Sequence, residues 1–221
     1  MNETIKIKNF FEGSPFMISD THFFHDKIYH KFEPCRQSFA SSREEFDQKM
    51  IEALKRTGGF CLLGDLVINS RNRAVFEERI GFVGEALKDI PKVLLMGNHD
   101  RGGEEFFKKT GWIVISCGFD LTGDSATVYK NAPPFLVTST QGKKVFLSHE
   151  PVLAKRTPTP YETDITRELG VWFERLSAEI NVHGHIHSKS MGNPSFVNVS
   201  AEALNFRPQK LSAILQKDME R

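Results

Sequence analysis

Cysteine and long apolar segments are both scarce in this sequence. The 221 residues include three cysteines, at positions 35, 61 and 117, and no two of them have Cys-x-x-Cys spacing. An odd number without that spacing argues against a disulfide framework and against a zinc knuckle. No apolar stretch is long enough to span a bilayer, and the first residues are too polar for the core of a signal peptide. We therefore expect a protein of the reducing cytoplasm that makes no contact with a membrane.

An excess of charge of one sign is also missing. Lys and Arg number 29 and Asp and Glu number 28, which gives a formal net charge of +1. Without a strong overall field, nothing draws the chain as a whole to nucleic acid, so a nucleic-acid partner stays open but is not favoured. Repeats and low-complexity segments do not stand out, and the length suits one domain spanning residues 1–221. The oligomeric state is left open.

What the sequence does contain is five short polar segments, each directly after an apolar run. They are Asp20-Thr21-His22, Gly64-Asp65, Gly97-Asn98-His99-Asp100, Ser148-His149 and His183-Gly184-His185-Ile186-His187. Short apolar runs bounded by Gly and polar residues are typical of buried strands. Polar residues just past strand ends lie where α/β sheets bind their ligands. The pattern predicts one site built from five strand ends, and its nitrogen and oxygen donors suit a pair of divalent metals.

Taken singly, several of these segments have an ordinary structural interpretation. Asp20 and His22 point to the same side of a strand and can hold one metal together, but such a pair also occurs on surfaces. Asp65 fits a strand-ending turn, and a lone histidine after a strand, such as His149, is common. His183 precedes the glycine of its segment, and we interpret it as a hydrogen-bonded core residue.

The other two segments are more specific. Asn98 offers a neutral carbonyl oxygen as a ligand, and the alternative is a turn held by Asx hydrogen bonds. His99 is then free of metal, and Asp100 beside it is expected to orient or charge it. His185 and His187 place two imidazoles on one side of a strand end, and histidine is the commonest metal ligand.

The rest of the chain divides into two halves. Helical patterns at residues 42–58, 71–88 and 104–109 alternate with the first strands, which predicts a parallel first half. Closely spaced strands are expected at 112–116, 126–129, 135–138, 144–147, 196–200 and 211–215, with a hairpin turn at 141–143 and one helix near 167–177. This pattern predicts an antiparallel-rich second half, so that two sheets pack together with helices outside.

In this order, the five segments resemble the signature of the calcineurin-like metallophosphoesterase superfamily, and especially its small bacterial and phage phosphoesterases. The signature reads D-x-H, G-D, G-N-H-[DE], H and G-H-x-H, and all five blocks occur between about Phe16 and Val199. The resemblance implies an α/β fold, a four-layer α/β/β/α sandwich of two mixed sheets. It also implies a dinuclear metal-dependent phosphohydrolase that cleaves phosphoester bonds with a metal-bridging hydroxide.

The resemblance also assigns the site residues. It implies a first metal held by Asp20, His22, Asp65 and His187, and a second held by Asp65, Asn98, His149 and His185. His99 and Asp100 match the catalytic His-Asp pair of the family. A mixed set of oxygen and nitrogen ligands fits Mn, Fe, Zn, Ni or Co, and we expect two divalent ions, with Mn²⁺ the most activating.

Substrate contacts are harder to assign. Arg36 follows the first metal motif among aromatic residues and is the first candidate to bind a phosphate, with Arg101 as the second. The alternative for residues 24–39 is a loop packed on its own aromatic side chains. Lys155 and Arg156 are further candidates to face the site, and the role of residues 151–179, including Tyr161, is left open.

Two classes of function compete. The first is an enzyme that hydrolyses a phosphodiester or a small phosphomonoester, nucleotides included. The second is a non-catalytic scaffold or binding protein that keeps the metallophosphoesterase fold. Since every implied ligand and His99 are retained, the enzyme is favoured.

Overall fold

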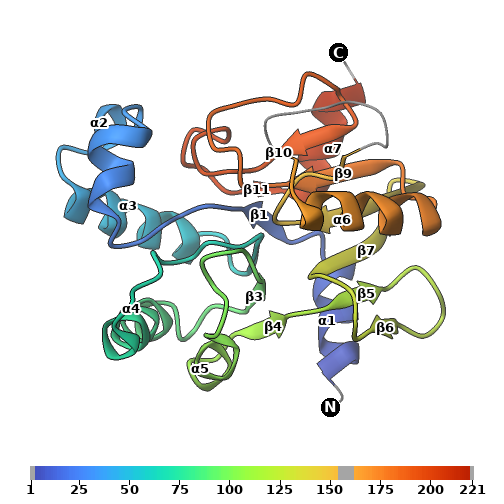
Figure 1. The fold of residues 1–221 in the computed structure, drawn as a ribbon, viewed down its shortest axis with the longest axis horizontal. Coiled ribbons are helices and arrows are strands. Elements are labelled where there is room, and N and C mark those ends of the chain that lie inside the picture. Colours follow the sequence, from blue (N-terminus) through green and yellow to red (C-terminus); the bar gives the residue numbers. More distant parts are fainter. Residues whose placement is uncertain (1–2, 154–161, 220–221) are drawn as a thin grey trace.

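The computed structural model describes residues 3–153 and 162–219 (Figure 1). Its first sheet is largely parallel. The strand order is β11-β1-β2-β3-β4. Strands β1 (Phe16–Ile18), β2 (Phe60–Leu62), β3 (Lys92–Leu95) and β4 (Ile113–Ile115) run parallel, and β11 (Gln209–Lys210) is antiparallel to β1. The parallel first half is therefore confirmed, and the strand near residue 113 belongs to it rather than to the second half.

The second sheet mixes both directions. Its order is β10 (Phe196–Asn198), β9 (Ile180–His183), β8 (Lys143–Ser148), β7 (Phe135–Thr140), β5 (Gly118–Asp120) and β6 (Thr127–Tyr129). The pairs β10–β9, β9–β8 and β7–β5 are parallel, whereas β7–β8 and β5–β6 are antiparallel. The hairpin between β7 and β8 turns at Gln141 and Gly142, both with positive φ, as its sequence predicted.

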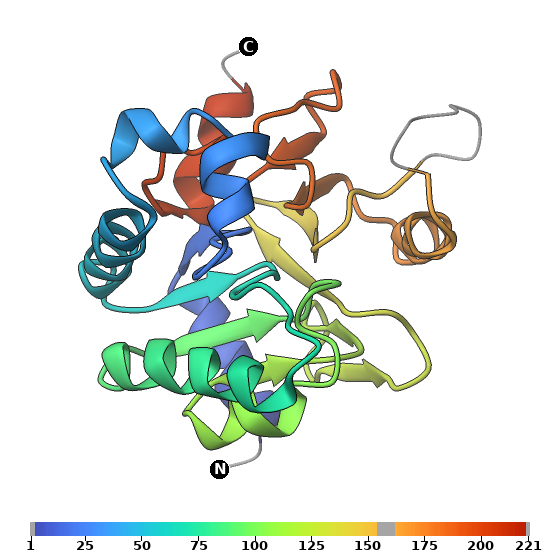
Figure 2. The same cartoon turned by 60° about the vertical axis from the view of Figure 1, so that its left-hand side comes forward.

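Helices cover the outer faces of both sheets. Helices α3 (Arg43–Lys55), α4 (Arg73–Ala86) and α5 (Glu104–Lys109) pack on the first sheet, and α6 (Asp164–Arg175) packs on the second. Figure 2 shows α3 and α6 on opposite sides of the molecule. Helices α1 (Glu3–Glu12) and α7 (Leu211–Met219) contribute side chains to the layer between the sheets. The result is the predicted α/β/β/α sandwich.

Alternation of side chains divides the core into layers. Met17 of β1 packs between the two sheets, whereas its neighbour Ile18 packs against the helices outside. In the same way Leu147 of β8 faces the space between the sheets, and Phe146 faces α6. Successive residues of a strand point to opposite faces, so a short, wholly apolar strand serves two cores at once.

Helix α3 begins where its sequence indicates. The Ser42 side chain accepts a hydrogen bond from the backbone N–H of Glu45 at 3.1 Å, which satisfies one of the free donors of the first turn. The Glu45 carboxylate reaches back one residue further than a capping box requires and accepts from the backbone N–H of Ser41. The motif therefore starts the helix with a slightly different set of partners.

The C-terminal segment corrects one prediction. Residues 211–215 form the start of α7 rather than a strand, and only Gln209–Lys210 pair as β11. Leu211, Ile214 and Leu215 recur at helical spacing and are all buried in the layer between the sheets. The segment was too short to separate a helix from a buried strand by its apolar residues alone.

Residues 24–39 are not an irregular loop. They contain a short π-helix, η1 (Ile28–Phe32), and a single helical turn, α2 (Arg36–Phe39). Within the residues that the structure describes, no helix has the length and apolar character needed to cross a membrane.

Candidate metal centre

The five polar segments follow strands whose ends meet at one edge of the sandwich. Asp20 follows β1, Asp65 follows β2, and Asn98 follows β3, all of which are parallel. His149 and His185 follow the parallel strands β8 and β9 of the second sheet. The structure brings all seven predicted ligands into one continuous cluster, in which each has a nitrogen or oxygen atom within 4.0 Å of another member.

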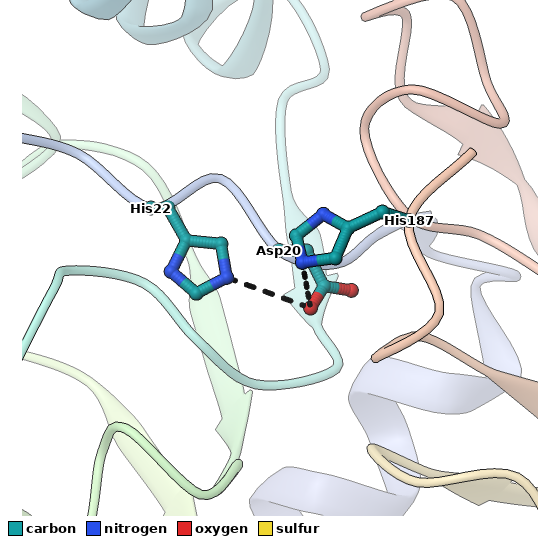
Figure 3. Close-up of side chains that lie close together, drawn as sticks. All are labelled: Asp20, His22 and His187. Carbon is teal, nitrogen blue, oxygen red and sulfur yellow. Dashed lines mark ion pairs between the residues drawn. The ribbon is translucent and has the colours of Figure 1, made fainter. Parts of the chain in front are cut away.

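Asp20, His22 and His187 make up one part of the cluster, which we call the Asp20 half. Asp20 Oδ1 lies 3.8 Å from Nε2 of His22 and 4.0 Å from Nε2 of His187 (Figure 3). This oxygen is buried and has no hydrogen-bond partner among the described residues. Leaving a buried carboxylate oxygen unpaired is costly. Asp20, His22 and His187 could together hold a divalent ion, which would compensate the charge of this buried oxygen.

Asn98, His149 and His185 make up the second part, the His149 half. His149 Nε2 lies 3.0 Å from Oδ1 of Asn98 and 3.2 Å from Nδ1 of His185. His149 Nδ1 pairs with the backbone carbonyl of Leu63 at 2.8 Å. When Nδ1–H donates to that carbonyl, Nε2 is left to face the other ligands, which is the arrangement of a metal-binding imidazole.

Asp65 lies between the two halves. Its Oδ2 is 3.5 Å from Nε2 of His22 and 3.4 Å from Nε2 of His149, so one carboxylate oxygen approaches both. Burial acts to raise the pKa of Asp65, but His149 and His22 outweigh it and hold this pKa well below its usual range. Burial likewise acts to lower the pKa of His149, yet Asp65 and Asp20 raise it to about 10. The site is thus arranged to hold positive charge.

The backbone of the cluster is strained. Five of the predicted ligands have φ in the left-handed region, namely Asp20 (57°), His22 (47°), Asp65 (58°), His185 (69°) and His187 (51°). Non-glycine residues rarely adopt this conformation, which costs on the order of 1–3 kcal/mol each and concentrates at functional sites. Gly64 allows the close packing, since a Cβ there would lie 2.5 Å from His149 Nδ1 and 2.7 Å from Gly97 Cα.

His99 stands at the mouth of the site. Its side chain is 33% exposed, and its Nε2 lies 3.9 Å from Oδ2 of Asp65. Its backbone N–H donates to the other oxygen of Asp65 at 2.9 Å. The imidazole is therefore accessible from outside while its backbone helps to hold the central carboxylate.

Asp100 has a different role from the one predicted. It is fully buried, and its carboxylate accepts backbone hydrogen bonds from Asp65 (2.7 Å), Leu66 (3.2 Å) and Gly97 (2.8 Å). It forms no hydrogen bond with the His99 ring in the part of the chain that the structure describes. Burial and the charge of Asp65 raise the pKa of Asp100 to about 7. Asp100 ties together the loops after β2 and β3 instead of contacting the His99 imidazole.

Arg36 also differs from its prediction. Its side chain is 1% exposed, and its Nε donates to Oε1 of Glu202 at 2.7 Å. Its two terminal nitrogens donate to the backbone carbonyls of Thr21 at 2.9 Å and Asp20 at 2.7 Å. Because α2 turns the guanidinium inward beneath the first metal motif, it has no free face for a phosphate. This burial contradicts the predicted substrate contact.

Glu202 is a site residue that the sequence interpretation missed. Its Oε2 pairs with Nδ1 of His187 at 3.3 Å, while Nε2 of the same ring faces Asp20. Burial acts to raise the pKa of Glu202, but Arg36 and His187 hold it below its usual range. A carboxylate on the far nitrogen of a metal-binding histidine fixes the tautomer and orientation of the ring. Glu202 follows soon after β10, and the other site residues also follow strand ends. This position in the sequence could have identified Glu202 as a candidate site residue.

The remaining predicted positions fall into three groups. Arg101 is exposed and lines a cavity of about 410 Å³ beside Asn98 and His149. His183 is buried with Nδ1 2.8 Å from the carbonyl of Gly184, as expected for a core histidine. Lys155, Arg156 and Tyr161 lie outside the described residues.

Comparison with known proteins supports the motif analysis. The model of the calcineurin-like phosphoesterase family matches residues 16–189, whereas no curated protein matches the chain. A solved protein of unknown function from Aquifex aeolicus is 20% identical, with a TM-score of 0.59 over 91% of this chain and 97% of that one. It shares the fold.

Two further solved structures match less well. A nuclease MPE from Pseudomonas putida is 16% identical, with a TM-score of 0.37 over 77% of this chain and 60% of that one. An archaeal phosphodiesterase is 14% identical, with a TM-score of 0.39 over 84% of this chain and 81% of that one. The TM-scores of these two structures are too low to support an inference about this chain. The family assignment therefore rests on the family model, which matches residues 16–189. The chain belongs to the calcineurin-like phosphoesterase family and is a metal-dependent phosphoester hydrolase.

Proposed function

We propose that this hydrolase works with two divalent cations, one in each half of the cluster, with Asp65 bridging them. The observation that carries the proposal is the position of Asp65 Oδ2, 3.5 Å from His22 Nε2 and 3.4 Å from His149 Nε2. One carboxylate has enough lone pairs to serve two cations at once. The unpaired Asp20 Oδ1 supports an ion in the Asp20 half, and the inward-facing Nε2 of His149 supports one in the other.

The donor set suits borderline metals. Carboxylate, amide and imidazole ligands without thiolate fit Mn, Fe, Zn, Ni or Co, and we propose Mn²⁺ as the most activating. When bound, two such cations polarise the phosphoryl group and lower the pKa of water, so that hydroxide is available near neutral pH.

Asp65, His99 and Asp100 each have a separate role in the proposed reaction. Asp65, held by the backbone N–H of His99, keeps the two halves at a fixed separation. The His99 imidazole is 33% exposed and lies near Asp65, which supports a role in stabilising charge on the phosphoryl oxygens and in protonating the leaving alkoxide. Asp100 contributes by clamping the loops that carry Asp65 and Asn98. The substrate is a phosphodiester or a small phosphomonoester.

Metal content and hydrolysis together test the proposal. Purified protein is stripped of metal, titrated with Mn²⁺ and assayed on p-nitrophenyl phosphate and bis(p-nitrophenyl) phosphate. We expect two Mn²⁺ per chain and hydrolysis that rises with the second equivalent. A single bound ion at full activity would overturn the bridging role of Asp65. Protein that binds metal but hydrolyses neither ester would instead favour the scaffold function.

A further inference from the structure

A cavity opens directly beside the His149 half. It has a volume of about 410 Å³, and Asn98 and His149 form part of its lining. The cavity is therefore continuous with the metal centre, and its size falls within the range of small-molecule sites in proteins. A phosphate held at the centre would direct one of its organic groups toward this space.

Part of the cavity wall is apolar. It is formed by Ala132, Pro133, Pro134, Ile165 and Leu169. These residues come from the turn before β7 and from α6, and Ala132 and Leu169 belong to the same core cluster outside the second sheet. Rigid proline rings and aliphatic side chains present surfaces against which a flat, weakly polar group packs well.

The polar residues of the cavity differ in how far their side chains are already paired. Glu104 is paired with Lys108 at 2.8 Å, so its charge is already compensated. Glu150 is only 6% exposed, and its one side-chain bond among the described residues is from the Thr163 hydroxyl to Oε2, at 2.9 Å. Arg101 is exposed and forms no ion pair or hydrogen bond within the described part of the chain.

A largely buried carboxylate with spare acceptor capacity is best matched by a ligand that offers hydrogen-bond donors. An alkyl chain would add no donor to the bond that Glu150 already accepts from Thr163, and a sugar alone would leave the apolar wall uncovered. A nucleobase offers both a flat face and ring N–H or amino donors at its edge. Arg101, which lines the cavity together with Asn98 and His149, would add a cation for a phosphate held at the centre.

We propose that this cavity is a nucleoside subsite, in which Glu150 accepts a hydrogen bond from the base and the apolar wall packs against it. The inference rests on the proposed function only in placing the phosphate at the metal centre. It narrows the substrates to phosphoesters of nucleosides.

Two esters with the same leaving group test the subsite. The p-nitrophenyl ester of thymidine 5′-monophosphate carries a base with an N–H donor. Bis(p-nitrophenyl) phosphate has no base and no N–H donor. We expect Glu150→Gln to raise KM for the thymidine ester about tenfold, the loss typical of one hydrogen bond to a charged acceptor, and to leave KM for the bis ester unchanged. Glu105→Gln, at a neighbouring carboxylate that is 80% exposed and does not line the cavity, is the matched control and is expected to change neither.

A second variant tests the subsite independently, in case Glu150→Gln does not fold. Ile165→Trp fills the cavity from its partly buried wall and is expected to raise KM for the thymidine ester more than Glu150→Gln does. Calorimetric binding of thymidine 5′-monophosphate is measured in parallel, because it does not require turnover. Binding that depends on Glu150 without hydrolysis would keep the subsite and refute the proposed function. Unchanged KM and unchanged binding in both variants would refute the subsite.

Discussion

The two halves of the centre are supported in different ways. Behind the Asp20 half stands a buried ion pair, in which Glu202 contacts His187 and Arg36 contacts Glu202. Arg36 also donates to the backbone carbonyl of Asp20, so a single guanidinium supports two of the predicted ligands. The His149 half has no such ion pair behind it in the described residues, and it borders the open cavity.

This difference indicates a division of labour. Asp20, His22 and His187 do not line the cavity, although His187 is 21% exposed and His22, at 3%, is no more buried than His149. The His149 half shares Asn98 and His149 with the cavity wall, so whatever occupies the cavity lies against it. We infer that one half serves to retain its ion and the other to receive the substrate.

Removing the residue that joins the halves should have the largest effect. In Asp65→Asn the amide offers one neutral oxygen and a nitrogen that does not bind metal, so two cations lose their shared ligand. We expect hydrolysis to fall to background and metal content to fall from two ions to one or none, measured by elemental analysis and assay of bis(p-nitrophenyl) phosphate. Asp26→Asn, at a carboxylate that is 73% exposed, is the control. Normal turnover in Asp65→Asn would refute the bridging assignment.

A smaller effect is expected from the residue at the mouth. His99→Ala removes the imidazole that we propose to act on the phosphoryl group, but none of the seven predicted ligands. Loss of one such group typically slows turnover by about 10²–10³-fold, so we expect a fall of this size with two Mn²⁺ still bound. His30→Ala, at an exposed histidine of the same chain, is the matched control. Loss of both metals in His99→Ala would instead make His99 a ligand.

The ligand cluster could be anticipated because it depends on local order along the chain. Asp20, Asp65 and His149 each follow an apolar run, and parallel strands bring such positions to one edge. The direction of a long side chain is not local. Arg36 meets Glu202 across 166 residues of sequence, and nothing near either residue indicates that the guanidinium turns inward.

The same limit applies to two other predictions, one about the C-terminal fold and one about Asp100. Leu211, Ile214 and Leu215 are apolar residues in a short segment, and only their packing against the layer between the sheets shows that they belong to a helix. Asp100 was paired with its sequence neighbour His99, yet its carboxylate points into the protein and binds the backbone of Asp65 and Gly97. In both cases tertiary contacts decide between two local interpretations.

The ion pair behind the Asp20 half provides the most discriminating test of the comparison. Glu202→Gln removes the carboxylate from His187 Nδ1, and loss of such a partner typically weakens metal affinity about 10–100-fold. Arg36→Met breaks the same ion pair but leaves the Glu202 carboxylate on the ring. Each variant removes one partner of the buried Arg36–Glu202 ion pair, so we expect each to lose on the order of 3–5 kcal/mol of stability.

Calorimetric titration with Mn²⁺ and thermal unfolding of the metal-free protein separate the two effects. If Glu202 orients His187, Glu202→Gln should weaken the binding of one ion more strongly than Arg36→Met does, while the other ion binds as in the wild type. Equal losses of affinity in the two variants would mean that Glu202 adds nothing beyond the support that Arg36 gives to the Asp20 and Thr21 carbonyls. In that case the Asp20 half would be no more specifically supported than the His149 half, and the proposed division of labour would fail.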